Sequence, residues 1–303
     1  MDTARAILAL ALVGVPAIHA QDLTPRAYLV TPIGSHAVIF SSSFSRGQIA
    51  LDPSVPIEDA RGSMELPMLG YYESFDLWGH SANITVIAPY AHALFHGSVA
   101  GEAAEASRSG LADARVRLAL NLSGGRAMNV GDYLKWKEKR LIGVSLTVSI
   151  PTGQYDSARV VNIGTNRWGF KPEAGLTRRW NRWALDAYGG VWFFTGNPAY
   201  YPGSSLRTQN VIGAIEGHWG YYFRPRLWAS LDVNFWTGGR STVNGMEKQD
   251  QQRDSRVGGT VAIPVNRHQS VKFSYSQGAY ITIGGAYKTV SVGWQYSWIS
   301  TAQ

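Results

Sequence analysis

A regular alternation of apolar and polar side chains constrains the fold of this chain more than any other feature of its sequence. In the range 227–236 every second residue is apolar, and Ser230, Asp232 and Asn234 stand between them. Successive side chains of a β-strand point to opposite faces, whereas a helix would spread these residues around its surface. The segment is therefore predicted to be a strand with one apolar and one polar face.

The alternation recurs along most of the chain, and the connectors between its segments alternate in length. The alternation is clear at 113–122, 140–150 and 270–277. Short connectors such as 180–182 alternate with long polar ones such as 237–253. Outer-membrane barrels have tight periplasmic turns and long extracellular loops, so we predict an all-β fold, a transmembrane antiparallel β-barrel of about twelve strands. The expected strands lie near 36–45, 64–75, 83–90, 111–122, 139–151, 168–179, 183–194, 209–222, 227–236, 254–263, 270–277 and 286–298.

The composition fits a barrel whose outer face meets lipid, although a large secreted β-sandwich would have a similar one. Charged residues make up 16% of the chain, against about 25% in soluble domains. The chain has no cysteine, which excludes disulfides and thiol chemistry. Its net charge is +7. Because the basic residues are scattered, we expect them to meet anionic lipid headgroups rather than nucleic acid.

Residues 1–20 have the pattern of a signal peptide. A basic residue precedes an apolar run at 6–15, and residues 18–20 resemble a small-residue cleavage site. The apolar run is too short to cross a bilayer, which takes about 20 residues. We expect residues 1–20 to be removed and residues 21–303 to form a single barrel domain in the bacterial outer membrane.

One connector on the predicted periplasmic side is unusually long. It spans 123–138, and within it residues 132–138 can form two helical turns with an apolar side. We expect a short periplasmic helix at this place.

The last predicted strand carries a recognisable pattern. Val290, Val292, Trp294, Tyr296 and Trp298 alternate with small or polar residues. A C-terminal strand of alternating apolar residues that ends in aromatics resembles the assembly signal of outer-membrane barrels. We therefore predict that Trp294, Tyr296 and Trp298 face lipid at the periplasmic edge and act as this signal. Membrane lipids and the barrel-assembly machinery are the expected partners.

Several motifs resemble one family of outer-membrane proteins. The most specific are PTGQYD at 151–156 and NIGTNRW at 162–168, and IAPY at 87–90, KPE at 171–173, VWFF at 191–194, GG at 238–239 and WQY at 294–296 accompany them. The chain resembles the "Putative MetA-pathway of phenol degradation" family of transporter-like outer-membrane barrels. The resemblance implies a barrel that admits small, often aromatic or apolar compounds, and it implies no catalytic or ligand-binding residue.

Polar residues at alternating positions are expected to line the lumen, where they would contact a solute. The candidates for solute contact are Glu216, His218, Asp232, Asn234, Arg256, Lys272, Arg115 and Arg117. Further residues expected on the lumen side are Glu65, Glu73, Asp113, Lys171, Glu173 and Asp186. The two signs of charge are mixed, so strong anion or cation selectivity is not expected.

A catalytic or metal site is the competing interpretation. Glu216, His218 and Ser230 have the residue types of a hydrolytic triad, although a lumen ion-pair network accounts for the same acid and imidazole. His92 and His96 have the spacing of a zinc helix, but Ala93 stands where the metalloprotease motif has Glu. We expect no catalytic residue, no metal site and no cofactor.

The function predicted from the sequence is a passive outer-membrane channel or transporter for small molecules, aromatic or apolar compounds among them. Two alternatives stay open, an outer-membrane lipid or ester hydrolase and a non-conducting structural barrel. Conductance of the reconstituted protein separates the channel from the structural barrel, and a lipid-hydrolysis assay detects the enzyme.

Overall fold

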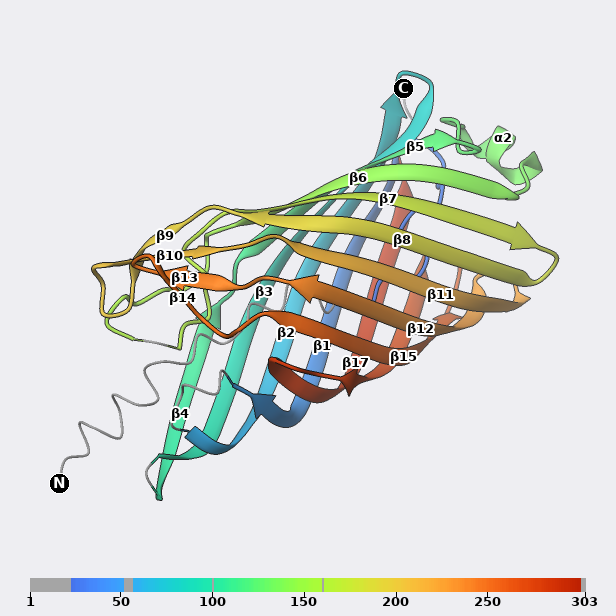
Figure 1. The fold of residues 1–303 in the computed structure, drawn as a ribbon. Helices are drawn as coiled ribbons and strands as arrows, with labels where there is room; N and C mark the ends of the chain where they lie inside the picture. Colours follow the sequence, from blue (N-terminus) through green and yellow to red (C-terminus); the bar gives the residue numbers. More distant parts are fainter. Residues whose placement is uncertain (1–22, 52–56, 100, 160, 301–303) are drawn as a thin grey trace.

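The chain folds into a closed antiparallel β-barrel (Figure 1). The computed structural model describes residues 23–51, 57–99, 101–159 and 161–300. Among these residues twelve strand positions close the wall, because β4 and β5 share one position beside β3. The wall strands are β1 (Ser35–Ala50), β2 (Ile57–Leu77), β3 (His80–Val99), β4 (Glu102–Leu111), β5 (Ala114–Ser123), β6 (Arg140–Ile150), β7 (Gly169–Trp180), β8 (Trp183–Phe194), β11 (Ile212–Arg224), β12 (Leu227–Gly238), β15 (Gln252–Pro264), β16 (Gln269–Tyr280) and β17 (Gly284–Ile299). The predicted fold is confirmed.

The barrel closes between its first and last strands. β1 pairs with β17 from Ser35 opposite Ile299 to Ala50 opposite Gly284, and its other edge pairs with β2. Apart from β4 and β5, which both pair with β3, each wall strand lies beside its neighbours in the chain, so the hairpins follow one another around the barrel. Closure leaves few unpaired strand edges, which is a requirement for a sheet that crosses the hydrocarbon of a bilayer.

The two ends of the barrel differ (Figure 1). One end carries a small separate sheet made of β9 (Asn197–Tyr200), β10 (Ser205–Gln209), β13 (Ser241–Val243) and β14 (Met246–Glu247). The other end carries α2 (Val130–Lys135) and the last described residues of β17. The predicted helix begins earlier than expected because the Asn129 side chain accepts a hydrogen bond from the Asp132 backbone N–H and caps it. Within the described residues, no helix has the length and apolarity needed to cross a membrane.

The alternation in the sequence separates an outer and an inner face. On β12, Leu231 is 74% exposed and Val233 is also exposed, whereas Asp232 is 1% exposed. Large apolar side chains on the outside, such as Ile215 and Trp219, would meet lipid. The buried interior is therefore largely polar, and its side chains determine what the barrel can hold.

Several wall segments that lie between the expected strands, β4 among them, are strands in the structure. β3 continues to Val99, so His92 and His96 belong to a strand that pairs with β2 and β4. The range 278–285 separates two expected strands, but β16 and β17 extend into it and leave residues 281–283 as a tight connection. In both places backbone pairing with a long neighbour extends the strand beyond the region of clear alternation.

The predicted lumen position of two acidic residues is wrong. On β2, Met64 and Met68 line the interior cavity. Side chains one residue apart point to opposite faces, so Glu65 and Glu73 belong to the outer face. Glu73 accepts a hydrogen bond from the hydroxyl of Tyr71, which is exposed on that outer face.

Candidate functional site

A segment that precedes the first strand occupies part of the barrel interior. Residues 23–34, here called the inner segment, contact β2, β5, β6, β7, β8 and β11. Tyr28 is 1% exposed and Val30 is 0% exposed. At its end the Ile33 N–H donates to the carbonyl of Met128, near α2, and the Gly34 N–H donates to the carbonyl of Ser74. The lumen at this level is therefore filled by the chain itself.

A buried arginine fastens the inner segment to the wall. Arg26 Nη1 lies 3.1 Å from Asp186 Oδ1 on β8, and its backbone N–H donates to the same carboxylate. Its Nη2 contacts Glu138, in the connector after α2, with the Oε2 atom at 2.6 Å. Hydrogen bonds to charged partners are stronger than neutral ones. The segment is thus held between a wall strand and the connector.

The Tyr28 ring packs against the wall at a place where two glycines have no side chain. Its hydroxyl lies 3.1 Å from Ser145 Oγ and donates to Glu173 Oε1 at 3.1 Å. A methyl group placed on Gly143 or Gly175 would overlap the Tyr28 ring. The absence of side chains at these two positions allows the ring to lie directly against the backbone.

An ion-pair network continues along the wall beside the inner segment. Lys171 Nζ lies 2.6 Å from Glu173 Oε2 and 3.3 Å from Glu216 Oε1. Glu216 Oε2 accepts a hydrogen bond from the Thr24 hydroxyl at 3.1 Å. Arg117, on β5, donates to the carbonyl of Ala27 at 3.2 Å. The lumen charges therefore pair with one another and hold the inner segment.

His218 sits between two carboxylates. Its Nδ1 lies 2.9 Å from Asp232 Oδ1, and its Nε2 lies 3.5 Å from Glu216 Oε2. Asp232 also accepts hydrogen bonds from the hydroxyls of Ser230 and Thr260, each at 2.7 Å. A hydrolytic triad needs its serine bonded to the imidazole. Here Ser230 donates to the carboxylate instead.

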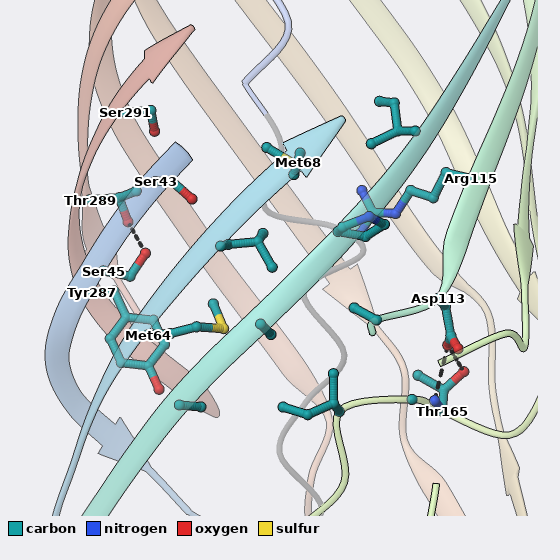
Figure 2. A pocket seen from close by; sticks show the side chains of 18 of the residues that line it. Ser43, Ser45, Met64, Met68, Asp113, Arg115, Thr165, Tyr287, Thr289 and Ser291 are labelled. Carbon is teal, nitrogen blue, oxygen red and sulfur yellow. Dashed lines mark hydrogen bonds between the residues drawn. The ribbon is translucent and has the colours of Figure 1, made fainter. Parts of the chain in front are cut away.

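A cavity of about 430 Å³ lies inside the barrel, next to the start of the inner segment at Leu23 and Thr24. Figure 2 shows Ser43, Ser45, Thr289 and Ser291 on one side of it and Met64 and Met68 on a neighbouring strand. A volume of this size suits a small ligand, since ligand pockets measure about 300–1,000 Å³. The cavity is the place where the barrel can hold a solute.

The loop 151–168 closes the wall beside this cavity. Among the described strands, β4 pairs with β3 alone, and β6 stops at Ile150. Asp113 joins the loop to the wall: it accepts hydrogen bonds from the Gly153 N–H, the Thr165 N–H and the Thr165 hydroxyl at 2.9, 2.9 and 2.6 Å. Figure 2 shows the two from Thr165. The Gln154 N–H donates to the carbonyl of Leu111. The two most specific sequence motifs thus lie in the loop that completes the wall.

A tyrosine in this loop keeps its proton. The Tyr155 hydroxyl donates to the carbonyl of Ala199 at 3.0 Å and accepts from Asn197 at 2.9 Å. Burial raises the pKa of Tyr155, and the hydrogen bond from Asn197 opposes that rise. The neutral hydroxyl therefore stays a donor and ties the loop to β9.

The structure brings only some of the candidate residues together. Glu216, His218 and Asp232 form one cluster, and Asn234 lies opposite Arg256 in the pairing of β12 with β15. The others are spread over the interior: Arg115 and Arg256 line the cavity, Arg117 contacts the inner segment, and Lys272 lies on the β16 face that carries Ser274 and Ser276. The aromatic rings of Trp294, Tyr296 and Trp298 form a consecutive series on β17.

Sequence reasoning missed the residues that fill and close the barrel. Arg26, Tyr28 and Glu138 precede or interrupt the alternating segments, so no periodicity marks them. Asp113 was expected in the lumen, but its contact with Thr165 is not visible in the sequence. The resemblance of 151–156 and 162–168 to a known family was the available signal for that loop.

A metal site has no support among the described residues. No group of three or more His, Cys, Asp or Glu side chains there has the geometry to hold a metal ion. His92 lies on β3 and contacts the hydroxyl of Ser109 on β4. The histidine pair is part of a strand, where the helical spacing has no meaning.

Comparison with known proteins identifies a family and a fold. The sequence model described as "Putative MetA-pathway of phenol degradation" matches residues 49–299. No curated protein matches the chain.

Three solved structures share the fold at low sequence identity. The COG4313 outer membrane channel from Pseudomonas putida F1 is similar over 91% of this chain and 100% of that chain, with a TM-score of 0.78 and 16% identity. The transport unit of the autotransporter AIDA-I from Escherichia coli is similar over 98% of each chain, with a TM-score of 0.53 and 8% identity. The β domain of the Bordetella autotransporter BrkA covers 87% of this chain and 100% of its own, with a TM-score of 0.50 and 12% identity.

Proposed function

Because the chain belongs to the family described as "Putative MetA-pathway of phenol degradation", we propose that it is a passive channel of the bacterial outer membrane for small molecules, apolar and aromatic compounds among them. The observation that carries this proposal is the cavity inside the barrel, which is lined partly by apolar side chains. The similar structure from Pseudomonas putida F1 is itself named as an outer membrane channel, which supports the same function.

The interior favours slow passage of small solutes over a wide aqueous pore. Barrels of 16–18 strands leave an open channel, whereas those of about eight strands fill with side chains. This barrel lies between these sizes, and its inner segment occupies the lumen beside the cavity. A solute therefore enters the cavity first and passes the inner segment next, so movement of that segment controls the rate.

We also propose that the protein catalyses no reaction. Ser230, the nearest hydroxyl to the His218 cluster on β12, donates to Asp232 rather than to the imidazole. His218 and Asp232 are each 1% exposed. A buried imidazole between two carboxylates serves as an ion-pair centre, and it has no bound nucleophile to activate.

The targeting of the chain follows the same proposal. Residues 1–20 lie outside the described residues, and we propose their removal as a signal peptide before Gln21. The inner segment would then begin close to the mature N-terminus. We propose that the α2 end faces the periplasm and that the β17 aromatics engage the barrel-assembly machinery. Mass spectrometry of the protein purified from outer membranes tests the cleavage, and a mature mass that includes residues 1–20 would contradict it.

The channel proposal is tested by uptake into intact Gram-negative cells. The apolar dye 1-N-phenylnaphthylamine brightens when it passes the lipopolysaccharide barrier, so its entry rate reports passage. Expression of the protein should raise the rate, and Met64→Asn with Met68→Asn should lower it because these side chains line the cavity. The control is Met246→Asn, since Met246 is exposed on β14.

Two results would contradict the proposal. Entry at the rate of cells that lack the protein would favour the structural barrel. Hydrolysis of a lipid or ester by the purified protein, lost in His218→Ala, would favour the enzyme, because members of a triad act as a unit.

A further inference from the structure

The cavity has two walls of opposite chemistry, and one of them ends in a buried guanidinium. We infer that it selects an amphipathic monocarboxylate, whose apolar body lies on the β2–β3 wall and whose carboxylate binds Arg256. This inference rests on the proposed channel function and names the solute class that the same cavity prefers.

The first wall is apolar and comes from two neighbouring strands. Its side chains stand at alternating positions of β2 and β3, which place them on one inner face. They are Met64, Leu66, Met68, Ile87, Pro89, Ala91, Ala93 and Phe95. Methionine adapts its shape to irregular apolar ligands. This wall can therefore pack against hydrocarbon groups of different shapes.

The second wall is a field of hydroxyl groups on four consecutive strands. They belong to Ser43, Ser45, Thr260, Ser274, Ser276, Thr289 and Ser291. Figure 2 shows one hydrogen bond within this wall, between Ser45 Oγ and Thr289 Oγ1, which lie 2.9 Å apart. Hydroxyls donate and accept hydrogen bonds equally well. A purely apolar solute would leave the hydroxyl groups of this wall without hydrogen-bond partners, whereas a solute with a polar head would bond to them.

Arg256 lies at one end of this wall. It is 4% exposed, and its Nη1 donates to Ser276 Oγ at 3.0 Å and Thr289 Oγ1 at 3.2 Å. The two hydroxyls hold the guanidinium along the cavity lining, and a guanidinium has five donors that match the two oxygens of a carboxylate.

One row of paired residues crosses the sheet from the first wall to the second. Met64 is the pairing partner of Ser45, Ser45 of Thr289, and Thr289 of Ser276. Neighbouring strands are about 4.8 Å apart, so this row spans about 15 Å from the methionine to Ser276, which Arg256 contacts. A medium-length chain or a substituted ring with one carboxylate has this extent.

The remaining charges favour an anion over a cation. Among the described residues that line the cavity, four are arginines (Arg115, Arg167, Arg207 and Arg256) and two are aspartates (Asp113 and Asp232). Both aspartates already accept hydrogen bonds from protein donors. Arg207 is also paired, with Asp250 Oδ2 at 3.9 Å, which leaves one more arginine than carboxylates. A cationic head would meet this excess of positive charge, whereas a carboxylate would be attracted by it.

The test measures binding directly, so that it does not depend on transport. Isothermal titration of the protein in lipid nanodiscs, with empty nanodiscs subtracted, compares octanoate with octan-1-ol and 4-phenylbutyrate with 4-phenylbutan-1-ol. Each acid should bind more tightly than its alcohol by about tenfold or more, because its carboxylate gains charge-assisted hydrogen bonds. The two pairs distinguish an aliphatic from an aromatic body.

Arg256→Gln should abolish the preference for the acid and leave the affinity for the alcohol unchanged. Arg256→Lys should keep part of the preference, because it retains the charge and loses the bidentate geometry. Lys288→Gln is the matched control, since Lys288 is an exposed cation on β17 outside the cavity lining. It should leave both affinities unchanged. Heat-modifiable migration confirms that each variant is folded.

Equal affinity for acid and alcohol in the wild-type protein would overturn the inference. So would a preference that Lys288→Gln removes as fully as Arg256→Gln does. If dye uptake into cells persists in either case, the channel proposal stands and only the solute class is wrong. If uptake is also absent, both are wrong.

Discussion

Arg26 Nη1 and Asp186 Oδ1 lie 3.1 Å apart inside the barrel, although the two residues are separated by 160 positions in the chain. Both side chains are buried, at 5% and 2% exposure. The pair joins a segment that precedes the first strand to a strand near the middle of the sequence. This contact holds the inner segment inside the lumen. Its removal should release the segment and open the channel.

Arg26→Ala should raise the single-channel conductance in planar bilayers. Breaking a buried ion pair costs about 3–5 kcal/mol because it leaves a charge without its partner. That energy corresponds to a shift of about a hundredfold or more towards release of the inner segment. Arg182→Ala, in the exposed turn between β7 and β8, is the control and should leave conductance unchanged. Equal conductance in wild type and Arg26→Ala would show that the segment does not limit flow.

Gly175→Ala should have the same effect without changing any charge. A methyl group there overlaps the Tyr28 ring and forces it away from the wall. The matched control is Gly189→Ala, because the nearest atom to a new methyl group at that position is 4.0 Å away. Conductance that rises in the first variant and stays constant in the second supports the packing shown here. A rise in neither would mean that Tyr28 can move aside at no cost.

Asp113→Ala should loosen the loop 151–168. The substitution removes the acceptor of three hydrogen bonds and leaves the Gly153 and Thr165 N–H groups without it. Limited trypsin digestion of the reconstituted protein should then cut faster after Arg159 or Arg167, as seen by mass spectrometry. Glu105→Ala is the control, since Glu105 is an exposed acid on the neighbouring strand β4 and lies outside the loop. Unchanged digestion of Asp113→Ala would refute the role of Asp113.

The topology should be visible from outside the cell. Cysteine introduced near Ala104, Tyr200 or Gln249 should react with a bulky maleimide added to intact cells, because these residues lie in or near the connections at the barrel end opposite α2. Cysteine at Asn181 or Arg226, in the tight turns at the α2 end, should not react. The chain has no native cysteine, so the background is zero. Labelling at Asn181 in intact cells would reverse the orientation.

Tyr296→Ser with Trp298→Ser should leave the protein unassembled in the periplasm. These rings contact one another and Trp294 in series, and Trp298 stacks on His36 at 5.4 Å between ring centroids. Trp219→Ser with Tyr221→Ser removes two aromatics from β11 instead and should still assemble. Normal heat-modifiable migration of the first variant in the outer-membrane fraction would disprove the assembly signal.

The strands were predictable because the two faces of a wall strand meet different surroundings, so apolar and polar residues alternate along its sequence. Where one face meets lipid and the other meets a polar interior, the type of each residue shows which face it lies on, as it does for Leu231 and Asp232. On β2 the rule fails, since Met64 and Met68 face inward and Glu65 faces outward. There the cavity makes part of the interior apolar, so residue type no longer separates inside from outside.

The sequence by itself determined the barrel, its strand order and most strand limits, because these depend on local periodicity and on connector length. Only the tertiary structure decided what fills the barrel and what closes it. The contacts of Arg26 with Asp186 and of Asp113 with Thr165 join residues far apart in the chain. Such pairs arise when closure of the sheet brings distant strands and a preceding segment into one enclosed volume, and no local pattern records which of them will meet.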